Sequence, residues 1–394
     1  MLPTAEPRPA SMNASGDSPR PSAAGPAARF SPRPAAVEAW LLKVPLERPY
    51  KLSFGPVKEF ETVLVRVTRQ DGAEGYGEAT LLTGYTDETI GETWARARQL
   101  VEAMAQPGFD AEAALAALDV SHPFLTTAFR TADEMAQGSP LLRLDRPARV
   151  PILGLLQGDT PQRIEAETEA LLQAGYRTLK VKVGFDPGRD AEIVAFAQRA
   201  VAGRARLRLD ANQGYSAGQA CEFLSRLHGD HIELFEQPCA AGDWDAHMQA
   251  LAVADQVGIP LMLDESIYSL REIEQAAALR AAAYVKVKLM KFNNLERLDA
   301  AIVRIGELGM RPVLGNGVAN DLGCWMEACV AARRIDNAGE MNGFLKPRGR
   351  LFGEPLPFED GAIVLQPGFV PRIDPAALDA FQVDRVGTRR ISIG

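Results

Sequence analysis

The chain has 394 residues, 46% of them hydrophobic and 24% charged, and its net charge of −8 excludes the basic surface of a typical nucleic-acid-binding protein. No apolar run reaches the ~18 residues of a membrane span, and four cysteines without a CxxC pair predict neither a disulfide framework nor a zinc site. We therefore expect a cytoplasmic protein with one large catalytic domain and a smaller partner domain, and with neither a membrane nor a nucleic-acid partner.

The first 35 residues are rich in proline, alanine, serine and arginine and contain no apolar block of a secretory signal. We predict a disordered tail over residues 1–35. The arginine and serine content leaves a transit peptide as an alternative, although Glu6, Asp17 and several prolines disfavour an amphipathic helix. A translation start upstream of Met12 would give the same composition.

Residues 36–145 have the pattern of a compact α+β domain. The run "ETVLVRV" (61–67) is rich in β-branched residues, and the Asp-Gly pair at 71–72 before "AEGYGEA" predicts a hairpin. Residues 87–105 and 110–118 repeat apolar side chains at intervals of three and four, which predicts helices.

Short apolar runs alternate with amphipathic stretches from residue 150 onward. This regular alternation predicts parallel strands joined by right-handed crossover helices, and about eight such units predict a closed barrel. An open doubly wound sheet is the alternative, but no strand is followed by its glycine-rich phosphate turn. The runs are 150–156, 178–184, 205–211, 232–238, 259–265, 282–290 and 311–317.

Five charged residues stand at or near the C-terminal ends of successive runs, one in each strand–helix unit. In a parallel barrel these ends converge on the face that carries the active site. We therefore expect three carboxylates from neighbouring strands to meet, with lysines on either side. The residues are Lys182, Asp210, Glu236, Asp264 and Lys288.

Three converging carboxylates repel one another and call for a compensating cation. An all-oxygen site suits Mg²⁺, with Mn²⁺ as a substitute. Such an ion stabilises the charge that develops when the carbon α to a carboxylate loses its proton, and buried lysines are suitable bases for that step. Any one of these acids alone fits a helix cap equally well. The "KVK" segment also fits an exposed edge strand, with Lys180 and Lys182 on one face.

Several motifs, taken together and in order, resemble the muconate lactonizing enzyme subgroup of the enolase superfamily. The resemblance covers residues from about 37 to 380. It implies a (β/α)7β TIM-like barrel over 146–359 and an N-terminal α+β capping domain over 36–145 that residues 360–394 complete. The motifs are "KVKVG" (180–184), "LDANQGY" (209–215), "FEQP" (235–238), "LDES" (263–266) and "VKLMK" (287–291).

The resemblance implies a catalytic role for three lysines. Lys182 matches the general base, and Lys180 matches the lysine that holds this base and the substrate carboxylate. Lys288 matches a second base on the opposite face of the substrate. Lys286 stands where the family usually has a polar uncharged residue, so it is either a further substrate contact or a lysine paired within the barrel.

The resemblance also implies the metal ligands and their neighbours. The family's three ligands match Asp210, Glu236 and Asp264. Asn212 matches a polar residue beside the first ligand, and Glu265 matches the acid that accompanies the second base. The four histidines of the chain lie elsewhere than at the seventh strand, which excludes the mandelate racemase subgroup.

Further substrate contacts are expected at the barrel mouth. Asn316 and Asp321 in "GNGVAND" (315–321) are candidates, although this segment also fits the start of a helix. Dipeptide epimerases carry Asp-x-Asp near the eighth strand. Here Glu340 and Asn342 stand there and would hold one amino group, a departure that disfavours a standard dipeptide. Loops of the capping domain would supply the lid residues Tyr50, Phe54 and Tyr85, for which ordinary interface packing is the alternative.

We therefore predict a Mg²⁺-dependent enzyme that removes the proton α to a substrate carboxylate through an enediolate intermediate. The outcome is racemisation or epimerisation, cycloisomerisation as in muconate enzymes, or dehydration as in a hydroxyproline-type dehydratase. A metal-independent Schiff-base lyase and a non-catalytic binding protein are the alternatives from other classes. We expect a small-molecule carboxylate as substrate and a homo-oligomer.

Overall fold

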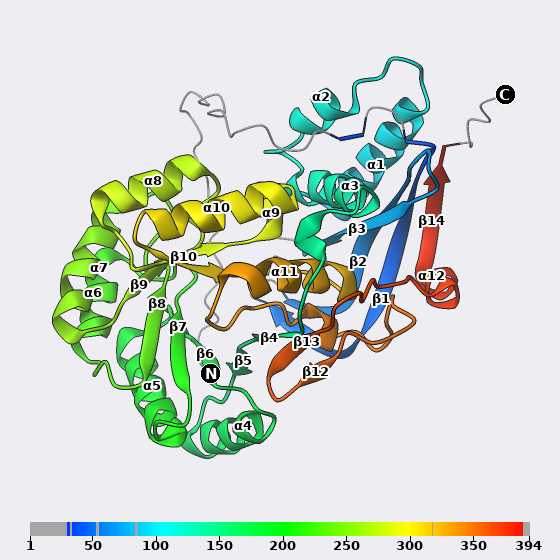
Figure 1. Cartoon of the computed structure of the whole chain (residues 1–394). Helices are drawn as coiled ribbons and strands as arrows, with labels where there is room; N and C mark the ends of the chain where they lie inside the picture. The colour runs from blue at the N-terminus through cyan, green and yellow to red at the C-terminus, as the bar shows by residue number, and fades with distance from the viewer. Residues whose placement is uncertain (1–29, 32–33, 53–54, 83–85, 317, 389–394) are drawn as a thin grey trace, which may run out of the picture.

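The computed structural model describes residues 30–31, 34–52, 55–82, 86–316 and 318–388. Figure 1 shows a sheet with its helices, coloured blue and cyan, beside a ring of strands and helices coloured green to orange. Most of the expected tail over 1–35 lies outside the described residues. The backbone N–H of Phe30 donates to Glu112 Oε2 at 3.1 Å, and the Phe30 side chain is buried.

The first part is an antiparallel sheet of four strands in the order β14-β1-β2-β3. The last strand of the chain therefore pairs with the first. The strands are β1 (Ala36–Leu52), β2 (Gly55–Thr68), β3 (Glu74–Leu81) and β14 (Gln382–Gly387). The helices of this part are α1 (Ile90–Met104), α2 (Ala111–Ala116) and α3 (Pro123–Ala136), and α12 (Pro375–Phe381) precedes β14.

Helix α3 lies directly on strand β3, and glycine makes this approach possible. A Cβ atom at Gly77 would lie only 2.0 Å from Ala128 O, and one at Gly75 only 2.1 Å from Ala132 O. The hairpin predicted at Asp71-Gly72 joins β2 to β3, with Gly72 at φ 84° as a left-handed turn position requires. The two glycines of "GYGEA" therefore allow helix α3 to pack closely on the sheet.

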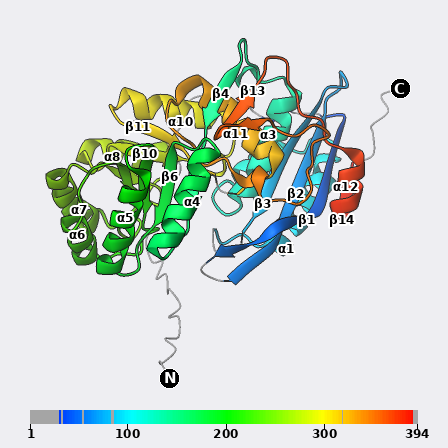
Figure 2. The same cartoon turned by 90° about the horizontal axis from the view of Figure 1, so that it is seen from below.

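The second part is a parallel barrel, and Figure 2 shows its ring of strands beside the sheet of the first part. Seven strands follow the order β11-β10-β9-β8-β7-β6-β5. They are β5 (Gly154–Leu156), β6 (Thr178–Lys182), β7 (Arg206–Asp210), β8 (Ile232–Glu236), β9 (Leu261–Leu263), β10 (Tyr284–Val287) and β11 (Arg311–Leu314).

The segment around Gly339 closes the ring in place of an eighth strand. Gly339 forms a parallel bridge with Ile152, and the N–H of Glu340 donates to Leu314 O at 3.0 Å. The predicted (β/α)7β barrel is thereby confirmed and the open doubly wound sheet is excluded. The covering helices are α4 (Pro161–Gln173), α5 (Pro187–Val201), α6 (Ala217–Ser225), α7 (Trp244–Val257), α8 (Leu270–Leu279), α10 (Leu295–Glu307) and α11 (Asp321–Arg334).

Two predicted runs differ from the structure. Residues 150–156 do not form one strand, because β4 (Ala148–Pro151) pairs with β13 (Ala362–Leu365) in a separate sheet and the barrel begins only at β5. That sheet has the order β12-β13-β4, with β12 at Phe358–Glu359. The run 282–290 ends its strand at Val287, and Lys288 precedes the short helix α9 (Leu289–Phe292). Two 3₁₀ turns, Pro140–Leu142 and Gly343–Leu345, complete the elements.

An apolar layer fills the interior of the barrel below the ends of the strands. Leu234, Met262, Tyr284 and Val313 form a buried cluster of their own. On the other side of the barrel the fully buried Arg208 of β7 donates to Ala338 O at 2.6 Å and to Glu233 Oε2 at 2.9 Å. Within the described residues, no helix is long and apolar enough to cross a membrane.

Two buried glutamates of the first part hold the barrel helices by their N-termini. Glu134 of α3 accepts from the N–H groups of Leu295 and Glu296 at 2.9 and 3.1 Å. Glu78 of β3 accepts from Asn320 and Gly323 at 2.6 and 3.1 Å. Burial raises the pKa of Glu134 to about 7 and that of Glu78 to about 8, against the backbone hydrogen bonds, which lower it.

These pKa values predict that the folded chain loses stability as the pH rises, because ionisation places a charge on each buried carboxylate. The folded chain binds more protons than the unfolded chain between pH 4.5 and about 7 at Glu134, so stability falls through that window. For this one group, the loss in the free energy of unfolding is at most ~1.4 kcal/mol per pH unit. Melting curves should show that Glu134→Gln loses less stability than the wild type between these pH values. The exposed Glu92→Gln of α1 is the control and should follow the wild type, and equal slopes for all three would contradict the assignment.

Candidate active site

The C-terminal ends of β6, β7 and β8 place three charged residues at one level of the barrel. Lys182 pairs in register with Asp210, and Asp210 pairs with Glu236. Lys180 lies two residues before Lys182 and therefore on the same face of β6, one layer deeper. The predicted convergence of these strand ends is what the structure shows.

Lys180 connects three carboxylates in the interior. Its Nζ lies 2.7 Å from Asp210 Oδ2, 3.0 Å from Glu236 Oε2 and 2.7 Å from Glu340 Oε1. Burial alone would lower the pKa of Lys180, but the three carboxylates raise it well above its usual value. Lys180 therefore stays a fixed ammonium group, which suits electrostatic support and not proton abstraction.

Lys182 lies at the mouth of the barrel. Half of its side chain is exposed, and its Nζ lies 2.5 Å from Asp210 Oδ2. It also donates to Asn212 Oδ1, and Asn212 Nδ2 donates to Glu265 Oε1 at 3.0 Å. The two lysines of "KVK" thus differ in depth, and Lys182 is the one that a molecule entering the mouth would meet.

Asp264 lies between two lysines on the other side of the mouth. Lys288 Nζ is 2.8 Å from Asp264 Oδ2, and Lys291 Nζ is 2.7 Å from Asp264 Oδ1. Although burial raises the pKa of Asp264, these lysines and Lys286 lower it well below its usual range. Burial lowers the pKa of Lys291 to about 8, against the attraction of Asp264. Lys291 was not among the predicted site residues, although the "VKLMK" motif contains it.

Lys286 is fully buried at the centre of the cluster. Its Nζ lies 2.5 Å from Glu236 Oε1, 2.8 Å from Glu340 Oε1 and 3.8 Å from Asp264 Oδ2. These contacts favour the alternative of a lysine paired within the barrel over a direct substrate contact. Glu340, which the sequence suggested for a substrate amino group, instead accepts from both Lys180 and Lys286.

The three carboxylates have the donor chemistry of a hard divalent ion. Asp210, Glu236 and Asp264 offer only oxygen ligands, and the buried Glu236 Oε2 has no hydrogen bond, although Lys180 Nζ is 3.0 Å away. Burial and Asp210 raise the pKa of Glu236 to about 7, against the lysines. Within the described residues no three acidic, histidine or cysteine side chains form a compact metal cluster. Ammonium groups lie between the carboxylates, so an ion would fit by replacing some of these contacts.

Two predicted substrate contacts have partners within the protein. Asp321 Oδ2 accepts from the N–H groups of Leu351 and Phe352 at 3.1 and 3.4 Å, which gives this carboxylate a structural task instead of the predicted substrate contact. Asn316 Nδ2 donates to Glu327 Oε2. Burial raises the pKa of Glu327 to about 8, against the hydrogen bond from Asn316.

The predicted lid cannot be placed. Phe54 and Tyr85 lie outside the described residues, as does the side chain of Tyr50. The contacts of the lid candidates therefore stay a prediction.

Gln237 fixes the end of β9 and was missed by the sequence analysis. Its Oε1 accepts from the N–H groups of Asp264 and Ser266 at 3.0 and 3.2 Å. Its Nε2 donates to Cys239 O and to Ser266 Oγ, both at 2.9 Å. Gln237 of "FEQP" thereby fixes the backbone from which the Asp264 side chain extends. Its place next to Glu236 in the sequence was a signal for such a role.

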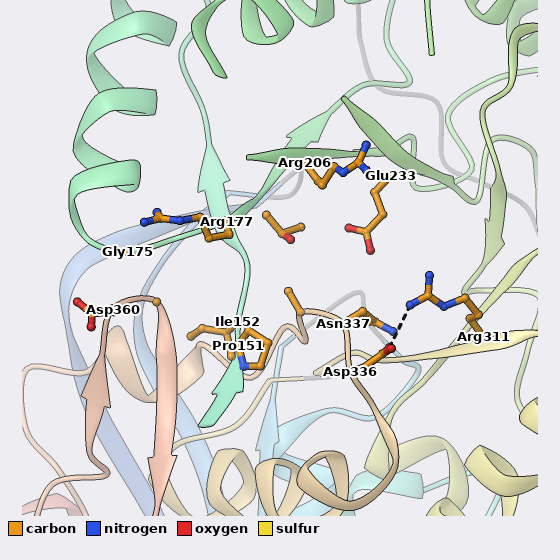
Figure 3. Close-up of a pocket in the computed structure, with 13 residues that line it drawn as sticks. Pro151, Ile152, Gly175, Arg177, Arg206, Glu233, Arg311, Asp336, Asn337 and Asp360 are labelled. Atoms are coloured by element: carbon orange, nitrogen blue, oxygen red, sulfur yellow. Dashed lines mark hydrogen bonds and ion pairs between the residues drawn. The ribbon is translucent and has the colours of Figure 1, made fainter. Parts of the chain in front are cut away.

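A hollow lies at the opposite end of the barrel, where the strands begin (Figure 3). Its lining includes Thr178, Arg206 and Arg311, which begin barrel strands, and Glu233, the second residue of β8. Arg311 pairs with Asp336 at 3.0 Å. None of the candidate site residues lines it. The charged cluster and this hollow are therefore separate features at opposite ends of the strands.

Comparisons with known proteins agree with this arrangement. The family model described as Enolase C-terminal domain-like matches residues 163–377, and that described as Mandelate racemase / muconate lactonizing enzyme, N-terminal domain matches residues 36–122. The hydrophobic dipeptide epimerase of Citrifermentans bemidjiense is 30% identical over 310 residues, which cover 74% of this chain and 82% of that protein. The L-Ala-D/L-Glu epimerase of Clostridium acetobutylicum is 29% identical, covering 70% and 79%.

A solved structure of similar fold is the N-succinyl Arg/Lys racemase from Bacillus cereus. It superposes with a TM-score of 0.78 at 23% identity and covers 91% of this chain and 100% of that one. The muconate lactonizing enzyme from Pseudomonas putida gives a TM-score of 0.74 at 23% identity, covering 88% and 98%. These likenesses establish the fold.

The contacts of Lys286 predict a large loss of stability when its charge is removed. Lys286→Met leaves Glu236 and Glu340 buried with fewer cationic partners, and breaking a buried pair costs about 3–5 kcal/mol. Urea unfolding at neutral pH should show this loss, and Lys286→Met combined with Glu340→Gln should recover part of it. The control is Lys43→Met in an exposed ion pair, with an expected change below about 1 kcal/mol. Equal stability of Lys286→Met and wild type would show that the buried pairs contribute little.

Proposed function

The chain belongs to the mandelate racemase/muconate lactonizing enzyme family of the enolase superfamily, and we propose that it racemises or epimerises a small carboxylic acid by removing and returning its α-proton. The proteins named above are two epimerases, a racemase and a muconate lactonizing enzyme, and a muconate cycloisomerase is also related. One observation supports this proposal most directly. Lys182 and Lys288 lie at opposite sides of the three carboxylates, each paired with one of the outer two.

The proposed reaction begins with the substrate carboxylate near the fixed ammonium group of Lys180. Lys182, in its neutral form, takes the α-proton, and the electron pair of the C–H bond moves into the carboxylate to give an enediolate. Lys288, in its charged form, then donates a proton to the opposite face of the same carbon. The two lysines exchange roles in the reverse direction, so both enantiomers are substrates.

The carboxylates of Asp210, Glu236 and Asp264 would hold a divalent ion, Mg²⁺ or Mn²⁺. When bound, the ion supplies positive charge that stabilises the developing negative charge of the substrate carboxylate. Asn212 and Glu265, joined by a hydrogen bond of 3.0 Å, support the ligands of this side. Gln237 keeps Asp264 in place through its backbone N–H.

Other outcomes share the first half of this reaction. Cycloisomerisation and dehydration also begin with loss of the α-proton, and differ only in the fate of the intermediate. No contact of the described residues favours either of them over racemisation. The homo-oligomer and the cytoplasmic location expected from the sequence stay predictions.

Isotope exchange tests the two lysines. In D₂O with Mg²⁺, the wild type should incorporate deuterium at the α-carbon of both enantiomers of a substrate, as followed by proton NMR. Lys182→Ala should lower exchange of one enantiomer by about 10²- to 10⁴-fold, and Lys288→Ala that of the other. Lys43→Ala, which changes an exposed lysine, is the control for folding and should exchange normally. Unchanged exchange in the Lys182→Ala, Lys288→Ala double variant would sink the assignment.

Metal removal tests the carboxylate site. We expect EDTA to abolish α-proton exchange and Mg²⁺ or Mn²⁺ to restore it, because the enediolate charge then lacks its main counter-charge. Borohydride added with substrate should leave the enzyme active. Exchange that survives EDTA, together with borohydride inactivation, would favour the metal-independent Schiff-base lyase instead.

A further inference from the structure

Glu327 is a buried acid of α11 that the proposed reaction does not use. Its residue is only 3% exposed, and Asn316 Nδ2 donates to its Oε2. Burial raises the pKa of Glu327 to about 8, whereas hydrogen bonds from Asn316 and from the backbone N–H of Leu289 lower it, as does the charge of Lys288. The carboxyl therefore lies near the second base and holds groups from two different segments of the chain.

The backbone on either side of Lys288 is held by two such segments. Lys288 is extended, at φ −140° and ψ 143°, and is the N-cap residue of the short helix α9. A lysine side chain has no acceptor with which to cap a helix, and this one makes no capping hydrogen bond. Before it, Val287 O accepts from the N–H of Gly315 at 2.8 Å. After it, the N–H of Leu289 donates to Glu327, which therefore takes the place of a capping side chain.

The side chain of Lys288 is confined along its length. A Cβ atom at Gly315 would lie 3.0 Å from Lys288 Cε, so the end of β11 leaves little room on that side. At the tip, Lys288 Nζ lies 2.8 Å from Asp264 Oδ2. A change in the direction of the backbone at Leu289 would be carried along this stem to Nζ, the atom that moves the proton in the proposed reaction.

Lys182 is held by different contacts. Its Nζ lies 2.5 Å from Asp210 Oδ2 and donates to Asn212 Oδ1. Asp210 ends β7 and Asn212 follows it, so the partners of Lys182 come from another part of the ring. A change at Glu327 should therefore affect one base and not the other.

We propose that Glu327 is a positioning residue for Lys288: its carboxyl holds the Leu289 N–H and the Asn316 amide, and thereby fixes where the Lys288 side chain begins. This inference rests on the proposed function, in which Lys288 serves one enantiomer and Lys182 the other. Glu327 acts through the lysine and not on the substrate. A displacement of about 1 Å at a reacting group costs on the order of 10²-fold in rate, so a small shift of Lys288 is enough to matter.

The ratio of the exchange rates of two enantiomers separates positioning from folding. The probes are enantiomeric pairs of amino acids, N-acetyl amino acids and N-succinyl amino acids, incubated with the Mg²⁺-loaded full chain in D₂O. The enantiomer served by Lys288 is the one whose exchange Lys288→Ala removes. In Glu327→Leu, which has no acceptor for either donor, its exchange should fall about 10-fold or more relative to that of the other enantiomer. This ratio does not depend on how much of the variant is folded.

Two conservative variants and a matched control complete the series. Glu327→Gln retains an amide oxygen for the Leu289 N–H and should keep the wild-type ratio. Glu327→Asp keeps the carboxyl on a shorter side chain and should shift the ratio as Glu327→Leu does, by a smaller factor, so it decides the matter if Glu327→Leu does not fold. The control is Glu134→Leu, which removes another buried glutamate that accepts from the first N–H of a barrel helix and should leave the ratio unchanged.

Hydrogen exchange of the substrate-free chain gives a second readout. By mass spectrometry, the backbone amides of residues 288–293 should exchange faster in Glu327→Leu than in the wild type or Glu134→Leu, because the first N–H of α9 loses its acceptor. Unchanged exchange of these amides would overturn the inference. An unchanged enantiomer ratio in both Glu327→Leu and Glu327→Asp, or an equal shift in Glu134→Leu, would also overturn it while leaving the α-proton chemistry intact. No exchange of any probe by the wild type would instead contradict the proposed function.

Discussion

The contact on which the site depends is the sharing of one buried ammonium group by three carboxylates. Lys180 reaches Asp210, Glu236 and Glu340 from β6, and none of these groups has enough water around it to be charged alone. Each charge is therefore stabilised by another that comes from a different strand. The barrel supplies this geometry because parallel strands bring their C-terminal ends to one face. Removing Lys180 would leave these three buried carboxylates with fewer cationic partners.

Spacing along the chain was enough to predict a closed barrel and five charged residues of the cluster, because one charged residue ends each strand–helix unit, and the family resemblance supplied the capping domain and further site residues. The partners of each charge were beyond the sequence. Lys180 and Glu340 are 160 residues apart, and only the closed ring shows that Glu340 faces two lysines. For the same reason the sequence did not reveal the role of Glu327, whose partner Asn316 follows β11. Lys291 and Gln237 belong to the motifs "VKLMK" and "FEQP". Their hydrogen bonds with Asp264 depend on how the chain turns after β10 and after β8.

The first part of the chain helps to position the charged cluster. Glu134 and Glu78 accept from the first N–H groups of α10 and α11, which are free at any helix N-terminus. Helix α11 follows β11 and the segment that contains Asn316, so the sheet of the first part is tied to the mouth of the barrel. Burial of these carboxylates is costly, and their raised pKa values measure that cost. The hydrogen bonds to α10 and α11 offset this cost, and they fix the orientation of the two parts.

Depth in the barrel explains how chemically identical side chains come to have different tasks. Lys180 is buried between three carboxylates, which raise its pKa well above its usual value, so it keeps its proton. Lys286 is buried in the same layer, between Glu236 and Glu340. Lys182 is half exposed, with one carboxylate and one amide as partners, and is open to a molecule at the mouth. In the proposed reaction, depth in the barrel therefore separates the lysine that holds charge from the lysine that moves a proton.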